Sequence, residues 1–322
     1  MKVLFIRLDH IGDCFLTLPA IKEFKSKFPH SKISVLCKKN TYDIFQSSQL
    51  VDEIFTLSLS HSTNHYEKSS GVFEIIKTIW QLNKVSFDRI YNFRDHIVER
   101  FLMYFVRGRY QSSIKHLMYH YDIHIMKRNR LMLGHAFDYR VSGESDYIKL
   151  YTGTIVENTK ESLKRKVEGK LLFHIGGSYM KKLPMKRLHE LILMLKKDME
   201  DIIIVKSPFD NLVFDDIDIV EIDSIVKWAY IAERARGCIC FDSGPMHVAA
   251  AHTQRLFAIF GPTSVAYFGP KSKDQKVFKS KDYKEDFIPG MRFSFDRFGK
   301  HLQEQDLDIL KREIELFFNK QP

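Results

Sequence analysis

Short apolar runs that alternate with segments of helical spacing limit the fold of this chain more than any other feature. Such runs predict strands buried on both faces, as in a parallel sheet covered by helices. In the first half of the chain the predicted strands are 2–8, 32–37 and 88–93, and the predicted helices are 13–28, 40–48 and 71–84. Strands that alternate with helices form right-handed βαβ units, so this half is predicted to be an α/β domain.

The alternation weakens over 95–153 and then begins again. In the second half the predicted strands are 171–175, 201–206, 238–241 and 256–260, and the predicted helices are 185–197, 224–236, a short helix after Gly244, and 303–319. A chain of 322 residues has the length of two such domains. We therefore predict two doubly wound domains, 1–155 and 156–322, with a linker near 153–168.

The loop between the first strand and the first helix holds the first candidate residue. This loop spans 7–13 and ends in Gly12 and Asp13. Ligands of open α/β sheets bind at the carboxyl ends of the strands, where such loops lie. The carboxylate of Asp13 has the chemistry to take a proton from an acceptor hydroxyl. Asp is also a favoured helix N-cap, which is the alternative explanation.

Two glycines and a lysine follow the first strand of the second half. Gly176, Gly177 and Ser178 come directly after that strand, and the glycines let backbone N–H groups approach an anion. Lys181 lies a few residues further on and can place a positive charge on a phosphate. A solvated surface loop is the alternative interpretation. The loop does not end in the Gly-Lys-Ser/Thr of a P-loop, which argues against ATPase chemistry.

A third loop, after the strand 238–241, leads into a short helix. Asp242 ends the strand, Ser243 and Gly244 turn the chain, and the next residue is a proline of the kind tolerated in a first helical turn. The N-terminus of this helix offers N–H groups and a positive dipole end, which suit a pyrophosphate. His247 lies near the same place; a lone histidine is usually structural, but this position favours a binding role.

Charge and composition narrow the class of protein. The net charge of +10 indicates an anionic partner, or only a lysine-rich composition. Arg94, Arg100 and Arg107 belong to a local basic excess and are weak candidates for contact with an anionic acceptor. No nucleic-acid-binding motif is present, and aromatic residues do not interleave with the basic run, so a nucleic-acid partner is not expected. The absence of GxGxxG likewise disfavours an oxidoreductase.

The cysteines and the apolar runs bear on compartment. Cys238 and Cys240 alternate along a strand, and with Cys14 and Cys37 they lack the spacing of a zinc site, so we expect four buried thiols and no metal. No run reaches the roughly 20 apolar residues of a membrane span. The chain also lacks the pattern of a signal peptide at its start. We expect a cytoplasmic protein.

Two segments of the chain resemble known motifs. The segments 7–13 and 16–20 resemble the amino-terminal motif of glycosyltransferase family 9, the ADP-heptose:lipopolysaccharide heptosyltransferases. The segment 242–250, followed by 260–263, is similar to the carboxy-terminal motif of that family. The resemblance implies a GT-B fold, in which two Rossmann-like domains face a central cleft. It also implies an inverting sugar transfer with a nucleotide sugar, ADP-heptose, as co-substrate and with no metal or other cofactor.

The resemblance carries roles onto individual residues. Asp13 matches the general base that has been proposed for the family. The donor-binding positions are matched by Gly176, Gly177, Ser178, Lys181, Asp242, Ser243, Gly244 and His247. In this fold the last helix commonly packs back on the first domain, which the pattern over 303–319 permits.

The resemblance leaves substrate details open. Lys206-Ser207-Pro208 stands where the family often has a glycine-rich turn, and Asp210 is a weak candidate for the ribose contact. The segment 95–153 matches nothing in the family pattern, so the acceptor and the linkage are open, as are the donor sugar, its base and the oligomeric state. We expect an anionic glycan or glycolipid acceptor and peripheral contact with the inner membrane surface. A non-catalytic sugar-nucleotide-binding protein, or a family member with another donor or acceptor, is the alternative.

Overall fold

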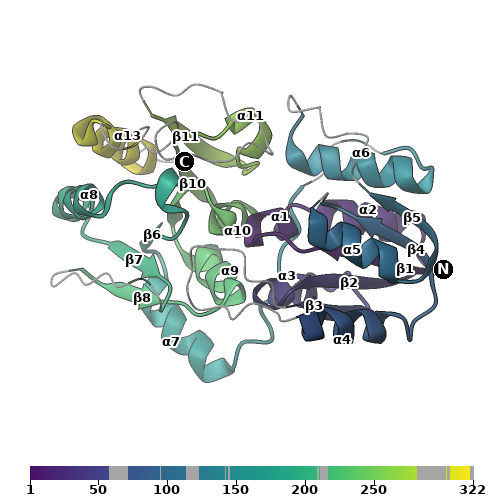
Figure 1. Ribbon diagram of the computed structural model, residues 1–322. Coiled ribbons are helices and arrows are strands. Elements are labelled where there is room, and N and C mark those ends of the chain that lie inside the picture. The colour runs from purple at the N-terminus through teal and green to yellow at the C-terminus, as the bar shows by residue number, and fades with distance from the viewer. Residues whose placement is uncertain are drawn as a thin grey trace. The chain divides into compact units, whose positions relative to one another are not determined.

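The computed structural model describes residues 1–57, 72–94, 96–113, 123–141, 143, 146–208, 210, 217–280, 302 and 305–319. The chain divides into two compact units, Met1–Tyr151 and Thr152–Pro322. Each unit contains one sheet in which all the paired strands run parallel, with helices beside it (Figure 1). This is the α/β architecture that the alternation of strands and helices predicts.

The sheet of unit 1 has the strand order β3-β2-β1-β4-β5. Its strands are β1 (Lys2–Arg7), β2 (Lys32–Lys38), β3 (Glu53–Leu57), β4 (Phe87–Asn92) and β5 (Gly108–Ser113). β1 lies in the centre, and its Val3 is level with Ile33 of β2 and Arg89 of β4. The edge strands β3 and β5 were not predicted, because they are half exposed and β5 contains few apolar residues.

The helices of unit 1 differ from the prediction mainly at the first one. They are α1 (Ile11–Phe15), α2 (Leu18–Lys27), α3 (Tyr42–Ser48), α4 (Val72–Leu82), α5 (Ile97–Phe105) and α6 (Ile125–Phe137), with a short 3-10 turn at Lys39–Thr41. The single helix predicted over 13–28 is wrong, since the chain ends α1 at Leu16 and starts α2 from Thr17. Pro19 in the first turn of α2 has no N–H to continue the earlier helix, which explains the break.

The two faces of this sheet are buried by different helices. Leu4, Ile6 and Leu8 share a core cluster with Leu82 of α4 and Leu102 of α5. On the opposite face, the ring of Phe5 lies 5.2 Å from that of Phe24 in α2 and 6.2 Å from that of Phe137 in α6. This alternation along β1 follows from the period of two in a strand.

The sheet of unit 2 has the strand order β11-β10-β9-β6-β7-β8. Its strands are β6 (Leu171–His174), β7 (Ile202–Lys206), β8 (Ile219–Glu221), β9 (Gly237–Phe241), β10 (Arg255–Phe260) and β11 (Asp274–Lys279). The outer strands β8 and β11 were not predicted, because β8 is short and β11 contains only two apolar residues, Val277 and Phe278. The carboxyl ends of β6, β9 and β10, which are neighbours, lie at one edge of the sheet.

The helices of unit 2 include one where a linker was expected. They are α7 (Glu157–Val167), α8 (Met185–Asp198), α9 (Ile225–Arg234), α10 (Gly244–His252), α11 (Val265–Phe268) and α13 (Leu307–Asn319), with a 3-10 turn at Tyr179–Lys181. α7 fills most of the predicted linker 153–168. Within the described residues, no helix is both long enough and apolar enough to cross a bilayer.

The last helix, α13, is part of unit 2. Its residues Leu310, Ile314 and Phe318 lie in one core cluster with Leu188 of α8 and Phe257 of β10. The apolar side of α13 is therefore buried within its own unit, and packing of this helix on the amino-terminal domain stays a prediction.

Candidate active site

In unit 1 the candidate site begins with Arg7, the last residue of β1. Its guanidinium donates a 2.7 Å hydrogen bond to the carbonyl of Phe93, which follows the adjacent strand β4. The same guanidinium lies 3.1 Å from Oδ2 of Asp9 and 3.5 Å from Oδ1 of Asp13. Because Arg7 is almost fully buried, it places both carboxylates at the carboxyl edge of the sheet.

Arg94 extends this arrangement from β4 toward α5. Its Nε lies 3.1 Å from Oδ1 of Asp9, and its Nη1 lies 3.6 Å from Oε1 of Glu99 and donates to the carbonyl of Leu8 at 3.0 Å. The backbone N–H of Arg94 donates to the side chain of Asn92. Asp13, Arg7, Asp9, Arg94 and Glu99 thus form a row of alternating sign, which we call the charge chain.

Asp13 lies in the first turn of α1, as predicted, but it is not the N-cap. His10 occupies that position, without a side-chain capping bond, so the N-cap explanation for Asp13 is wrong. The Asp13 side chain is 30% exposed, and Arg7 contacts one of its carboxylate oxygens. The backbone carbonyl of Asp13 accepts a hydrogen bond from the hydroxyl of Thr17.

Two groups at or near the charge chain, Glu99 and His10, have pKa values that differ from their ordinary values. Burial raises the pKa of Glu99 to about 6, and the nearby Arg94 opposes this shift. Partial burial of the ring lowers the pKa of His10, and the positive charge of Lys38 lowers it further. Part of this side chain remains open to solvent. At neutral pH Glu99 is therefore mostly ionised, and His10 is mostly neutral.

The three candidate acceptor residues do not gather in one place. Arg94 belongs to the charge chain, whereas Arg100 lies on the exposed side of α5. Arg107 immediately precedes β5, whose Gly108 is paired with Phe87 at the start of β4. Arg107 therefore lies at the amino edge of the sheet, a strand length of about 17 Å from the Asp13 edge.

In unit 2 the two predicted loops and the segment after β10 meet at Asp242. The ammonium of Lys181 lies 2.9 Å from Oδ2 of Asp242, and the hydroxyl of Thr263 donates to the same oxygen. These residues follow β6, β9 and β10, which are adjacent strands. The Lys181 side chain is 22% exposed, so it remains accessible to solvent at this edge of the sheet.

The glycines after β6 are required by their surroundings. A side chain at Gly176 would place its Cβ 2.6 Å from the ring of His174, which accepts a 3.1 Å hydrogen bond from the N–H of Gly176. Gly177 has a φ of +145°, a conformation that favours glycine, and a Cβ added there would lie 3.5 Å from the Cβ of Ser243. Gly177 and Ser178 are exposed. This loop thus brings its backbone close to the start of α10.

The start of α10 keeps its N-terminus without a side-chain cap. The hydroxyl of Ser243, the N-cap, donates back to the carbonyl of Phe241 at 3.0 Å. The indole N–H of Trp228 in α9 donates to the carbonyl of Pro245 at 2.8 Å, and its ring lies 4.7 Å from that of His174. An uncapped helix start has donors for an anion.

Comparison with known proteins decides the family. A family model described as glycosyltransferase family 9 (heptosyltransferase) matches residues 75–287. The chain belongs to this family. This is the family that the segments 7–20 and 242–263 resemble.

Relatives agree with this assignment. The chain is 22% identical over 313 residues to lipopolysaccharide heptosyltransferase 3 of Escherichia coli, and the match covers 85% of this chain and 87% of the relative. Among solved structures, E. coli heptosyltransferase WaaC with ADP has a TM-score of 0.71 at 16% identity, covering 98% of this chain and all of that one. A family 9 protein of Veillonella parvula has a TM-score of 0.74 at 15% identity, covering 99% and 97%. These two structural likenesses show the GT-B fold.

For this family 9 protein, three predicted donor residues have partners within the protein. Asp242 is nearly fully buried and is engaged by Lys181, so its carboxylate positions that lysine. His247 is buried in α10, and its contact with a donor stays a prediction. The carboxylate of Asp210 accepts a hydrogen bond from the N–H of Ser207, so it shapes the turn after β7 rather than standing open for a ribose.

Sequence reasoning missed Glu99 and Thr263. Glu99 lies in the segment that matched no family pattern, and nothing in its local sequence distinguishes it from a surface glutamate. Thr263 lies in a quoted motif, but only the three-dimensional structure brings its hydroxyl to Asp242.

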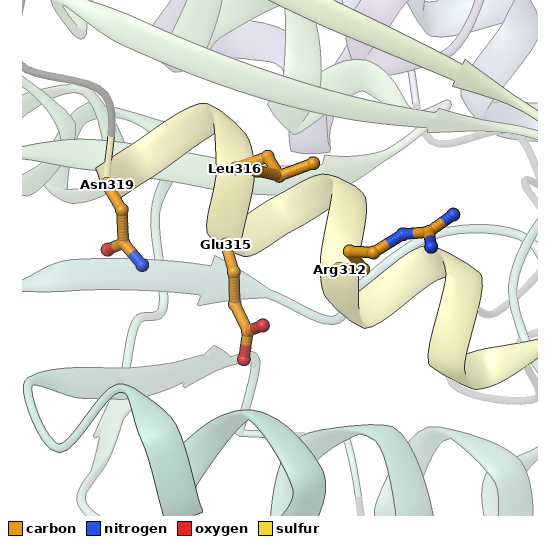
Figure 2. A pocket seen from close by; sticks show the side chains of 4 residues that line it. All are labelled: Arg312, Glu315, Leu316 and Asn319. Atoms are coloured by element: carbon orange, nitrogen blue, oxygen red, sulfur yellow. The ribbon is translucent and has the colours of Figure 1, made fainter.

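A pocket on the outside of unit 2 is unrelated to these residues. It is lined by Arg312, Glu315, Leu316 and Asn319 of α13, and Figure 2 shows them projecting from that single helix. No predicted site residue lines it. Among the described residues, no group of three or more His, Cys, Asp or Glu side chains is placed to hold a metal ion. The four cysteines are buried, and burial raises the pKa of Cys37 and of Cys238 to about 12.

Proposed function

We propose that this glycosyltransferase moves a heptose from ADP-heptose onto a lipopolysaccharide core or a related anionic glycan, with inversion at the anomeric carbon and without a metal. Two comparisons support the donor and the acceptor class. The curated relative is named a lipopolysaccharide heptosyltransferase, and one similar structure contains ADP. The reaction would take place in the cytoplasm, at the inner membrane surface.

One observation carries the donor side of the proposal. Lys181, the backbone around Gly177 and the uncapped start of α10 lie at one edge of the unit 2 sheet. A diphosphate is stabilised by fixed N–H donors and a positive charge, most of all where water is excluded. In this proposal Asp242 holds the lysine in place, Thr263 holds Asp242, and the ammonium contributes its positive charge to the phosphate site.

Asp13 carries the acceptor side. The attack of an acceptor hydroxyl on the anomeric carbon breaks the bond from that carbon to the diphosphate oxygen, and the electron pair leaves with ADP. The hydroxyl proton passes to the carboxylate of Asp13 as the new bond forms. Arg7 holds Asp13 in place, and Arg94 is the nearest candidate for an anionic group of the acceptor. The reaction requires Asp13 and Lys181 to face one substrate pair, which stays a prediction.

A donor screen tests the proposal. The protein is incubated with ADP-heptose, other ADP-sugars and UDP-sugars, with and without a lipopolysaccharide core acceptor, and nucleotide release is measured. We expect acceptor-dependent release from ADP-heptose and a product anomer opposite to that of the donor by NMR. Release that favours a UDP-sugar would overturn the donor, and a retained anomer would overturn the mechanism.

An Asp13 variant tests the base. Asp13→Asn is expected to lower turnover by about 10²- to 10⁴-fold, the usual contribution of a general base, with the affinity for ADP unchanged. Asp308→Asn is the matched control, because Asp308 also lies in the first turn of a helix but is exposed on α13. Equal turnover in the wild type and Asp13→Asn would remove Asp13 from this role.

A non-catalytic binding protein is the alternative from another class. It would bind ADP-heptose without releasing ADP in the presence of any glycan acceptor, and Asp13→Asn would then have no effect on any measured rate.

A further inference from the structure

The outer sides of α4 and α5 are unusually apolar for an exposed surface. Phe73, Ile76 and Trp80 of α4 recur at the spacing of one helix face, as do Ile97, Phe101 and Tyr104 of α5. All six are exposed, with fractions of 80% for Phe73, 60% for Trp80 and 82% for Tyr104. We call these six side chains the aromatic face. A cluster of this size on a soluble domain marks a surface that binds something.

The two helices form one surface because they are tied together. Both bury their other sides in the same core cluster, through Leu82 and Leu102. At their ends, the side chain of Asn83 donates a 3.0 Å hydrogen bond to the carbonyl of Phe105 and accepts a 2.7 Å bond from the N–H of Arg107. α4 and α5 run alongside the sheet of unit 1 (Figure 1). Their exposed sides therefore both point away from the sheet.

The charge on this surface has one sign. Within 72–94 and 96–113, every exposed charged side chain is a lysine or an arginine, and these are Lys77, Lys84, Arg100, Arg107 and Arg109. The three acidic residues of the same segments are less exposed than these cations, although the hydrogen-bonded carboxylate of Asp88 lies at the surface. Glu99 is fully buried, Glu74 is partly buried, and Asp88 accepts a hydrogen bond from the N–H of Lys2.

Aromatic and basic groups are interleaved at close range. The ammonium of Lys84 lies 3.4 Å from the centre of the Trp80 ring. Indole and phenol rings prefer the boundary between headgroups and acyl chains, and lysine or arginine beside them contacts anionic headgroups. An amphipathic helix with such a pair of faces lies in the plane of a membrane surface.

We propose that the aromatic face docks this protein on an anionic phospholipid bilayer. The inference builds on the proposed glycolipid acceptor, because it names the surface on which that acceptor would be met. A second copy of the chain is a poorer occupant, since a symmetric contact would bring the same five cations against one another. Glu99, in the first turn of α5, lies 3.6 Å from Arg94, so the docked helix begins at the edge of the unit 1 sheet where we propose that the acceptor binds.

Vesicle binding tests the inference without any donor or acceptor. The full-length protein is mixed with vesicles of phosphatidylcholine alone or with phosphatidylglycerol added, and sedimentation is measured. We expect binding to the anionic vesicles that weakens with salt. Trp80→Gln with Tyr104→Gln should weaken it by about tenfold or more, since burial of each ring contributes on the order of 1.5 kcal/mol or more. Lys77→Gln with Arg107→Gln should weaken binding to anionic vesicles specifically.

Control variants distinguish binding by the aromatic face from nonspecific binding by other exposed apolar residues. Leu193→Gln removes an exposed apolar residue from α8 in unit 2 and should bind vesicles like the wild type. The chain has two tryptophans, and Trp228 is buried, so a blue shift on vesicle addition reports Trp80 and should vanish in Trp80→Phe. Thermal unfolding verifies that each variant folds.

Several results would overturn the inference. These are no vesicle binding by the folded wild type, binding that the aromatic-face variants leave unchanged, or self-association in the ultracentrifuge that the same variants abolish. Turnover on a soluble, delipidated acceptor is a separate measurement. It should be equal in the wild type and Trp80→Gln, so a failure of membrane docking is distinguishable from a failure of the proposed reaction.

Discussion

The ammonium of Lys181 lies 2.9 Å from a carboxylate oxygen of Asp242, and that carboxylate is almost entirely buried. Thr263 donates to the same oxygen, so the anion has two partners from two different loops. A buried carboxylate with such partners is a fixed anchor. The lysine is therefore held in place at the carboxyl edge of the sheet, where we propose that its charge meets a phosphate.

The first prediction concerns this lysine. Lys181→Met should weaken ADP binding by about 10- to 100-fold in calorimetry, because a charge-assisted hydrogen bond contributes roughly 1.5–3 kcal/mol. Lys182→Met removes a neighbouring ammonium and is the control, for which we expect unchanged affinity. Asp242→Asn keeps the lysine but loosens its anchor, and should give an intermediate loss. Wild-type affinity in Lys181→Met would show that the lysine does not contact the phosphates.

The second prediction concerns the backbone at Gly177. Its φ of +145° is unfavourable for a residue with a Cβ, so Gly177→Ala should lower stability by about 1–2 kcal/mol and also weaken ADP binding. Gly169→Ala is the matched control, because Gly169 has a φ of +70° with open space around it, before β6. Both variants should unfold at lower temperature. Only Gly177→Ala should lose affinity, and equal affinities would separate this loop from the donor.

The third prediction concerns the buried end of the charge chain. Since burial raises the pKa of Glu99 to about 6, the folded protein holds this proton more tightly than the unfolded chain does. Ionisation of Glu99 therefore disfavours the folded state as pH rises from about 4.5 to 6. The free energy of unfolding of the wild type, relative to Glu99→Gln, should fall by about 2 kcal/mol across this range. Denaturant titrations at a series of pH values measure it, and a flat difference would contradict the prediction.

The fourth prediction concerns His174, for which the pH dependence of stability is opposite to that for Glu99. Burial lowers the pKa of His174 to about 4, so the unfolded chain binds this proton more readily than the folded protein. Stability linked to His174 is complete above about pH 6.5 and is lost as pH falls toward 4, by about 3 kcal/mol. The wild type should lose this much relative to His174→Gln over that range in denaturant titrations. An NMR titration of the imidazole with a midpoint near 6.5 would disprove it.

Much of the fold followed from the sequence because the central strands are apolar on both faces. β1, β2, β6, β9 and β10 were predicted within one or two residues of their ends. The edge strands β3, β5, β8 and β11 escaped because a half-exposed strand does not need an apolar run. An edge strand is held by hydrogen bonds to the strand beside it. That strand is distant in the sequence, so a local sequence pattern does not reveal the pairing.

The sequence predicted where the candidate site residues lie, but not which side chains they contact. Asp13, Lys181 and Ser243 follow strands, and any parallel sheet collects such residues at one edge. That Asp242 would bind Lys181 depends on two loops about 60 residues apart meeting at a side-chain distance. Glu99 shows the same limit, since its burial beside Arg94 is set by how α5 packs and not by its own neighbours in the sequence.

The indole of Trp228 links the two loops of unit 2 that we propose for the diphosphate, because it contacts His174, the last residue of β6, whose ring bonds the N–H of Gly176, and Pro245 in α10. Neither loop can then shift by itself without disturbing the other. The two loops therefore take up their arrangement when the unit folds. A ligand that binds there would meet a preorganised site and would not have to order the loops.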